Sequence, residues 1–223
     1  MQTTLLLDMA ADAAPDRLAL GRLSDGVTFD EVRIRARAGA AWLDGLGGET
    51  VAFLGLNGPA LAVAVFASGL IGKPFTPLNY RLPDADLNKL LARTAPSVLI
   101  IDEDMIGRLQ PADGVTVVTR GQFEAACLDQ ANRARGLPEV DPDIGVLLFT
   151  SGTTGEPKAA VLRHRNLTSY VISTVEFLGS DEDEAALVSV PASHRRHLGG
   201  ADRSLRRAPH RASAGLHAGN LGR

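Results

Sequence analysis

The sequence predicts an α/β fold with a doubly wound, mostly parallel β-sheet and flanking helices. Short apolar runs that suit strands alternate along the chain with stretches in which apolar residues recur at helical spacing, the order expected of a parallel sheet. One stretch, residues 59–72, is apolar on all sides, and a helix of that kind must be covered on more than one face. A bilayer span needs ~20 residues. Because this longest apolar run is shorter, no membrane span is predicted.

Each element follows from local signals. Residues 24–26 read Ser-Asp-Gly, a turn signal between two short apolar runs, and so predict a hairpin. Thr28 or Asp30 is placed to cap the next helix, which two consecutive glycines end. Asp84 is placed to cap a later helix, and Pro96 separates that helix from the following strand. The predicted elements are hairpin strands 18–20 and 27–29, helices 32–46, 59–72, 84–93 and 123–128, strands 51–54, 98–101 and 116–119, a kinked strand and turn 72–79, and a surface loop 129–143.

The residues near the N-terminus and the cysteine count bear on the compartment. Cys127 is the single cysteine, so no internal disulfide can form, and a small, half-buried thiol in a reducing cytosol is expected. Residues 1–14 have no basic start and include two aspartates, which does not suit a secretory signal. The sequence therefore predicts a cytoplasmic protein.

The stretch from Thr150 to Lys158 carries the strongest chemical signal in the chain. It follows the apolar run 144–149 and precedes the ordered stretch 161–178, which places it in a tight loop. Glycine allows consecutive N–H groups to turn toward one anion, hydroxyls add hydrogen-bond donors, and a lysine adds a mobile positive charge. The sequence predicts a polyphosphate-binding loop, against the alternative of a surface turn rich in Ser, Thr and Gly. The predicted phosphate-binding residues are Thr150, Ser151, Gly152, Thr153, Thr154, Gly155 and Lys158.

The order of residues in this loop resembles one family signature. The Walker pattern does not fit, because Glu156 and Pro157 stand between Gly155 and Lys158. The nonapeptide resembles the phosphate-binding signature of the adenylate-forming (AMP-binding) superfamily. The stretch 149–170 is most similar to fatty-acyl-CoA synthetases and acyl-AMP ligases. That family usually has glycine after the lysine, where this chain has Ala159.

The resemblance extends over roughly residues 15–191. Residues 72–101 are similar to the second core motif of the family, which is structural there. Residues 28–31 resemble the early T-[YF]-x-E-L segment, and residues 164–167 resemble the H-x-N-L segment that follows the phosphate loop. An N-terminal adenylation domain is the fold that this resemblance implies.

The same resemblance implies a two-step reaction. A carboxylic acid, with a fatty acid as the favoured substrate, reacts with ATP to give acyl-AMP and pyrophosphate, and the acyl group is then transferred to CoA. Two anions must approach each other, so charge has to be neutralised and the groups held in line. Mg²⁺ is implied as the bridging ion. Its acidic ligand lies further along the chain in the family, and we assign no catalytic residue and no metal ligand in this sequence.

Three ionisable residues lie near these motifs. His194 is a candidate substrate-site residue, because residues 191–194 resemble the start of the P-x-x-H-x-x-G segment, although position 197 is histidine instead of glycine. His164 is expected to be an exposed or capping residue without an acid–base role. Glu156 occupies a variable position of the family and is expected to be solvated.

The composition changes near residue 191. The net charge is −3, yet seven of the 23 Lys and Arg residues and only one of the 26 acidic residues lie in residues 192–223. The later family motifs are not found, and an arginine-rich, Ala/Gly-rich stretch is what a GC-rich gene gives when it is read out of frame. We therefore expect a partial adenylation domain at residues 1–191, a basic tail at 192–223 that is disordered or out of frame, and little activity from this chain.

A second interpretation is a non-enzymatic phosphate- or nucleic-acid-binding module that uses this tail. Six arginines lie within residues 194–211, enough for salt-sensitive contacts with phosphates. The tail has no aromatic residue on which bases could stack, so nucleic-acid binding is not favoured. A Rossmann dehydrogenase is not favoured either, because no G-x-G-x-x-G follows a strand.

Overall fold

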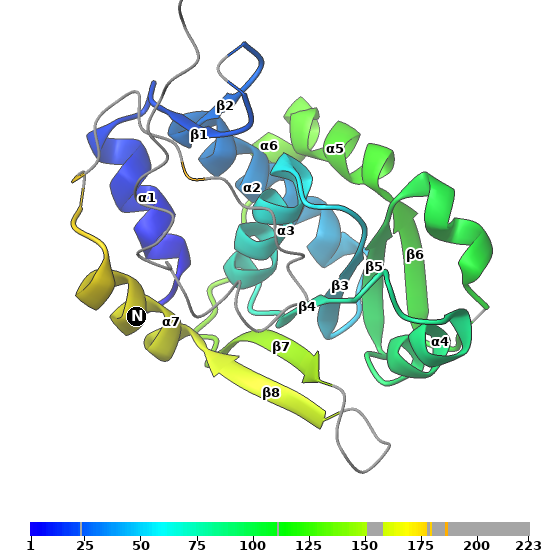
Figure 1. The fold of residues 1–223 in the computed structure, drawn as a ribbon. Coiled ribbons are helices and arrows are strands. Elements are labelled where there is room, and N and C mark those ends of the chain that lie inside the picture. The colour runs from blue at the N-terminus through cyan, green and yellow to red at the C-terminus, as the bar shows by residue number, and fades with distance from the viewer. Residues whose placement is uncertain (23, 111, 151–157, 178, 180–185, 187–223) are drawn as a thin grey trace, which may run out of the picture.

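The chain folds around a six-stranded sheet in the order β6-β5-β3-β4-β7-β8, in a computed structural model that describes residues 1–22, 24–110, 112–150, 158–177, 179 and 186. Neighbouring strands are parallel except β7 and β8, which form an antiparallel hairpin. The predicted α/β class with a mostly parallel sheet is thus confirmed (Figure 1). The strands are β3 (Thr50–Leu54), β4 (Phe75–Pro77), β5 (Ser97–Ile101), β6 (Val115–Thr119), β7 (Ile144–Thr150) and β8 (Lys158–Arg163), with β1 (Leu18–Leu20) and β2 (Val27–Thr28) in a separate two-stranded sheet.

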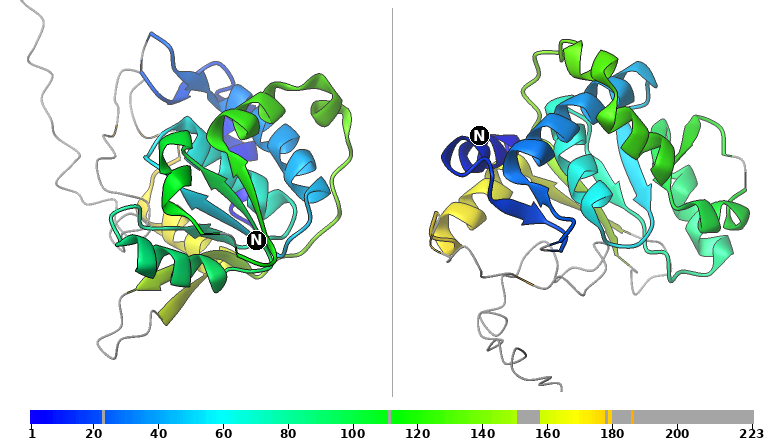
Figure 2. Two further views of the ribbon diagram at one scale, coloured as in Figure 1. Left: turned by 90° about the vertical axis from the view of Figure 1, so that its right-hand side faces the viewer. Right: turned by 90° about the horizontal axis from the view of Figure 1, so that it is seen from above.

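Helices cover both faces of the sheet, as expected of a doubly wound fold (Figures 1 and 2). One face carries α2, α3 and α5 and a core that includes Phe53, Phe75 and Phe123. The other carries α4 and the 3₁₀ helix η1, with a smaller core around Leu54 and Leu99. The helices are α1 (Thr4–Ala13), α2 (Phe29–Gly45), α3 (Pro59–Leu70), α4 (Asp84–Ala92), η1 (Glu103–Arg108), α5 (Arg120–Leu128), α6 (Gln130–Ala134) and α7 (His164–Thr174).

Side chains at the helix starts confirm one predicted cap and correct another. Thr28 accepts a hydrogen bond from the Glu31 amide at 3.3 Å, while its own amide donates to the Glu31 carboxylate at 3.0 Å, so that α2 begins with a reciprocal capping box. Asp84 does not cap α4: it is the first helical residue, and Pro83 occupies the cap position. The Asp84 carboxylate instead accepts from Arg108 Nε at 2.7 Å, a partner that is distant in sequence.

The predicted helices do not include α1, η1, α6 or α7, and Cys127 lies deeper than predicted. Helix α1 lies in the first 14 residues, and α6 interrupts the predicted surface loop, where Asp129 Oδ1 accepts from the Ala131 amide at 2.9 Å. Cys127 is 3% exposed, more buried than the half-buried position expected. Burial raises the pKa of its thiol to about 12, so the thiol stays protonated and unreactive at neutral pH.

The contact between α2 and α5 depends on a glycine. A Cβ placed on Gly39 would lie 2.9 Å from both Cys127 Sγ and Phe123 Cε2, closer than packed atoms allow. Alanine in a helix is normally more stable than glycine by about 1 kcal/mol. We expect Gly39→Ala to destabilise the fold instead, by about 1–3 kcal/mol, because the two helices must separate.

Gly45, on the same helix, is the matched control for Gly39. A Cβ there would meet only the guanidinium nitrogens of Arg135, at 3.5 and 3.6 Å, so Gly45→Ala should stabilise by about 0.5–1 kcal/mol. Chemical denaturation of both variants measures these changes in the free energy of unfolding. A gain in stability from Gly39→Ala would show that α2 and α5 are less closely packed than described.

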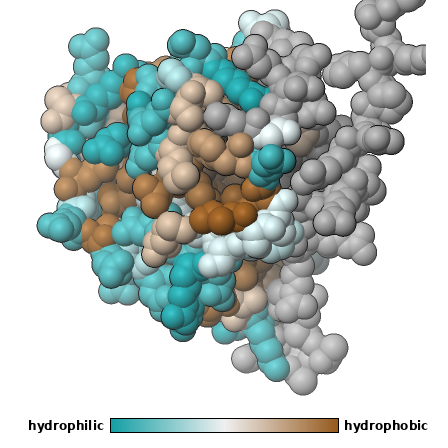
Figure 3. Space-filling model, turned by 90° about the vertical axis from the view of Figure 1, so that its left-hand side faces the viewer, coloured by the Kyte–Doolittle hydropathy of each residue, from teal (hydrophilic) through white to brown (hydrophobic). Residues whose placement is uncertain are grey.

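The face that carries α1 and α7 is partly apolar. Figure 3 shows hydrophobic surface interspersed with polar groups on this side of the molecule. The side chains of Leu5 and Met9 on α1, and of Met1 before it, recur at four-residue spacing and are 41–59% exposed, and Ile172 on α7 is 55% exposed. These two helices therefore contribute only part of their apolar surface to the core.

Strand β6 forms one edge of the sheet. It pairs with β5 alone among the described residues, and Figure 2 (left) shows it at the front of the molecule, between the helices of the two faces. The Val115 amide donates to the carbonyl oxygen of Ala112 at 3.2 Å, and the Thr119 amide donates to Gln122 Oε1 at 2.8 Å. Both ends of the edge strand thus have local hydrogen-bond acceptors.

Candidate functional site: the carboxyl edge of the sheet

The candidate site lies where the parallel strands end. Strands β3, β4, β5 and β7 run in the same direction, so the loops that follow them meet at one edge of the sheet. In open α/β sheets this carboxyl edge is where ligands bind, at the point where the chain reverses its winding. Here the chain winds from β3 to β4 in one direction and then to β5 on the other side of β3.

Strands β7 and β8 hold the two ends of the predicted phosphate-binding loop. Thr150, the last residue of β7, lies opposite Lys158, the first residue of β8, and the register continues down the hairpin as Phe149 opposite Ala159. Lys158 is exposed. The loop is therefore closed between two paired strands. The other predicted phosphate-binding residues, Ser151, Gly152, Thr153, Thr154 and Gly155, lie outside the described residues.

The loop end of this hairpin packs against the α4 face of the sheet. The Phe149 ring joins the smaller core cluster, and Arg93 at the end of α4 places its guanidinium carbon 5.8 Å from the centre of that ring. A cation over an aromatic face at this distance is attractive. Phe149, directly before Thr150, is thus held by contacts with the end of α4, which belongs to the connection between β4 and β5.

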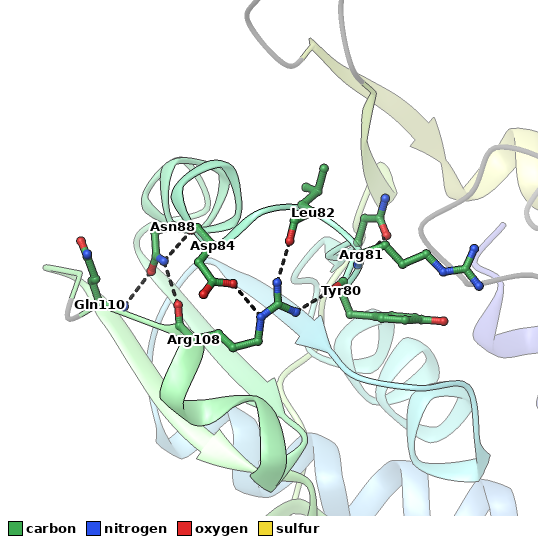
Figure 4. Close-up of polar contacts among 8 residues, drawn as sticks. Tyr80, Arg81, Leu82, Asp84, Asn88, Arg108 and Gln110 are labelled. Carbon is green, nitrogen blue, oxygen red and sulfur yellow. Dashed lines mark hydrogen bonds and ion pairs between the residues drawn. The ribbon is translucent and has the colours of Figure 1, made fainter.

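Arg108 fixes the loop that follows β4 (Figure 4). Its guanidinium donates to the carbonyl oxygens of Tyr80 and Leu82, both at 2.6 Å, and to Asp84 at 2.7 Å. Asn88 strengthens the arrangement by donating to the Arg108 carbonyl at 2.9 Å. In Figure 4 the side chains of Tyr80 and Arg81 point away from Arg108. Sequence reasoning missed Arg108, because its acceptors lie 24–28 positions away and follow no local pattern.

A largely buried ion pair joins the ends of β3 and β5 to the start of α5. Asp102 accepts from Arg120 Nε at 2.5 Å and from the Leu56 amide at 2.8 Å, and Arg120 donates to the Leu56 carbonyl at 2.7 Å. A Cβ on Gly55 would lie 2.5 Å from the Asp102 carboxylate, so only glycine fits there. The carboxylate and the guanidinium are 12% and 19% exposed. This pair sets the shape of the carboxyl edge beside the candidate loop.

His164 does not occupy the exposed or capping position that we expected. It is 3% exposed, and the ring lies between α1, α3 and β7 at the amino end of α7. Its pKa is lowered, first by burial and second by the positive N-terminus. Its burial was missed because the side chains around it come from segments that are distant in sequence. His194 and Glu156 lie outside the described residues.

The described residues show no group of three or more His, Cys, Asp or Glu side chains that could hold a metal ion, so we assign no residue to the Mg²⁺ that the resemblance implies. Within this part of the chain, every helix is too short or too polar to cross a bilayer.

Comparisons with known proteins agree with this architecture. The family described as AMP-binding enzyme matches residues 7–199. A feruloyl-CoA synthase from Amycolatopsis sp is 34% identical over 194 residues, which cover 85% of this chain and 39% of the relative. An indoleacetate–CoA ligase from Aromatoleum aromaticum is 31% identical over 156 residues, 65% of this chain and 31% of the relative. This chain therefore spans about two fifths of the length of the feruloyl-CoA synthase.

A solved structure shows the same fold. The N-terminal domain of FACL13 from Mycobacterium tuberculosis superimposes with a TM-score of 0.68 at 22% identity, over 79% of this chain and 48% of that one. At this identity the likeness concerns the fold alone. Because the family match covers most of the residues, including the loop between β7 and β8, the chain belongs to the AMP-binding enzyme family.

Proposed function

We propose that this chain supplies the phosphate-binding part of an enzyme that activates a carboxylic acid with ATP and transfers the acyl group to CoA. The observation that carries the proposal is the β7–β8 hairpin, which closes the nonapeptide signature between Thr150 and Lys158 inside the matched region. ATP and CoA come with the family, and Mg²⁺ would add charge neutralisation at the β and γ phosphates.

The chemistry explains why a cationic loop is needed. In the first step a carboxylate oxygen forms a bond to the α-phosphorus of ATP, and the bond from that phosphorus to the bridging oxygen breaks, so that pyrophosphate leaves with the electron pair. In the second step the sulfur of CoA attacks the acyl carbon, its proton is lost, and AMP leaves. Lys158 and the loop hydroxyls would hold the leaving pyrophosphate, whose charge grows during the first step.

The class of carboxylic acid that the enzyme activates is also a proposal. The resemblance of residues 149–170 favours a fatty acid, whereas the two ligases reported above are named for ferulate and indoleacetate, which are aromatic. The likeness to FACL13 carries no substrate argument at its level of identity. We propose an aromatic or fatty carboxylic acid and place aromatic acids first in the test.

Replacement of Lys158 tests the phosphate-binding role directly. We expect Lys158→Ala to weaken binding of MgATP and of inorganic pyrophosphate by about tenfold or more, since a hydrogen bond to a charged oxygen contributes roughly 1.5–3 kcal/mol. Isothermal titration calorimetry at fixed ionic strength measures this. Lys89→Ala is the matched control, because Lys89 is exposed on α4 and belongs to another element. Equal affinities in both variants would exclude Lys158 from the site.

Pyrophosphate exchange tests the reaction itself. The chain is incubated with ATP, labelled pyrophosphate and one acid at a time from a panel of ferulate, indoleacetate and palmitate. Exchange is scored separately from binding, because the sequence predicts little exchange from residues 1–223. Exchange that requires one acid would assign the substrate class, and failure to bind MgATP or pyrophosphate at all would refute the proposed function.

A further inference from the structure

His164 lies in a buried position shaped by two glycines. A Cβ on Gly145 of β7 would lie 3.1 Å from its Nδ1 atom, and a Cβ on Gly69 of α3 would lie 3.4 Å from Cε1. The ring is 3% exposed. The imidazole therefore fills a space that both neighbouring elements leave open, where water has little access.

The hydrogen bonds of the ring define its protonation state. Thr3, at the start of α1, brings its hydroxyl to 3.0 Å and its backbone amide to 3.4 Å from Nδ1. A backbone amide can only donate, so Nδ1 must keep its lone pair and the neutral ring carries its proton on Nε2. Nε2 is buried and has no hydrogen-bond partner among the described residues. The site thus fits a neutral imidazole.

No described group around the ring compensates a positive charge. Gly69 of α3 and Gly145 of β7 lie beside the ring and carry no charge, and Met1, which precedes α1, contributes its ammonium, which repels an imidazolium. The Asp143 carboxylate, which precedes β7, is paired with Arg163. Thr168 on α7 donates to the His164 carbonyl, away from the ring.

We propose that His164 is an acid-sensitive clasp that holds the first turn of α1 against α3, β7 and α7. Protonation of Nδ1 would set its N–H against the Thr3 amide, so that two donors face each other and the contact is lost. Figure 1 shows the N-terminus beside α7, the arrangement that this clasp maintains. Apart from the clasp, the first residues are held by a bond from Gln2 Nε2 to the Val140 carbonyl at 2.8 Å and by a long contact, 3.5 Å, from the Thr168 hydroxyl to the Met1 carbonyl. Further along α1, Leu7 and Ala11 are buried.

The direction of the pH dependence follows from the depressed pKa. The pKa of His164 is lower when α1 is docked than when α1 is released, so the released state binds the proton more readily. The first turn of α1 is therefore fully docked above the ordinary histidine pKa of about 6.5, and its docking is lost as the pH falls below that value.

Hydrogen exchange read by mass spectrometry tests the clasp on the whole chain. Protection factors for residues 1–7, corrected for intrinsic rates, are compared at pH 7.5 and pH 5. We expect the wild type to lose protection at pH 5, because His164 binds its proton more readily when the first turn of α1 is released. His164→Asn keeps an acceptor near the Nδ1 position and does not titrate, so it should keep its protection at both pH values.

Two further variants serve as controls in the hydrogen-exchange experiment. Asp12→Asn removes the pair between Asp12 and Arg33 on α2 and should lower protection equally at both pH values, leaving the pH response intact. Thr3→Val removes one of the two donors and should reduce protection already at pH 7.5, which tests the clasp even if His164→Asn folds poorly. Unchanged protection of the wild type at pH 5, or the same loss in His164→Asn, would refute the proposal.

Discussion

Replacement of Asp102 by alanine is expected to lower the free energy of unfolding by about 3–5 kcal/mol, the cost of breaking a buried ion pair by removing one partner. Arg120 would keep its charge at 19% exposure without its carboxylate, and the Leu56 amide would lose its acceptor. Arg120 begins α5 and Leu56 follows β3, so both groups lie at the carboxyl edge. The loss should therefore appear in global stability and in the order of this edge.

Urea denaturation followed by circular dichroism measures the effect of Asp102→Ala. Asp113→Ala is the control, since Asp113 is an exposed aspartate between η1 and β6, and it should leave the transition midpoint unchanged. If both variants unfolded at the wild-type midpoint, the ion pair would contribute nothing to stability. A changed slope without a changed midpoint would point to an altered unfolded state instead.

Replacement of Phe53 by alanine is expected to cost about 3–5 kcal/mol, the range for removing a large aromatic ring from a packed core. Phe53 is 1% exposed on β3, in the interior of the sheet. Its ring centre lies 6.3 Å from that of Phe75, and the Arg120 guanidinium carbon lies 5.3 Å from it. The substitution would remove contacts from the core and from the ion pair together.

The control for Phe53 is Phe177→Ala, which removes the same side chain from a site that is 53% exposed and should leave the midpoint unchanged. Because Arg120 contacts both Phe53 and Asp102, the double variant Phe53→Ala/Asp102→Ala should lose less than the sum of the two single losses. Strict additivity would show that the two contacts act independently. A small effect of Phe53→Ala alone would mean that the core collapses around the missing ring.

The elements that the sequence predicts well are those whose signals are local. The capping residue Thr28 and the apolar runs of β3, β5 and β6 specify their elements within a few positions. Helix α1 has no side-chain cap, and its buried residue Leu7 joins the core that α2, α3 and the sheet strands form. Its existence depends on tertiary contacts that periodicity does not report.

The same distinction between local signals and distant contacts applies to the candidate site. The loop before Lys158 could be found because its chemistry is contained in nine consecutive residues. The residues that support it could not, since Arg108 reaches back to Tyr80 and Arg120 reaches back to Leu56. The burial of His164 likewise depends on Gly69 and Gly145, whose separation in sequence hides that they face one ring.

The hydrogen bonds at the ends of β6 affect how this protein behaves among other chains. An exposed strand of uncharged, β-branched residues such as Val115–Thr119 is a template onto which a foreign strand can add, the first step toward fibrous aggregates. The Ala112 carbonyl and the Gln122 side chain already occupy the amides at its two ends. An incoming strand would therefore find fewer free N–H donors than the length of β6 suggests. The turn before β6 and the cap of α5 thus protect this edge of the sheet from extension.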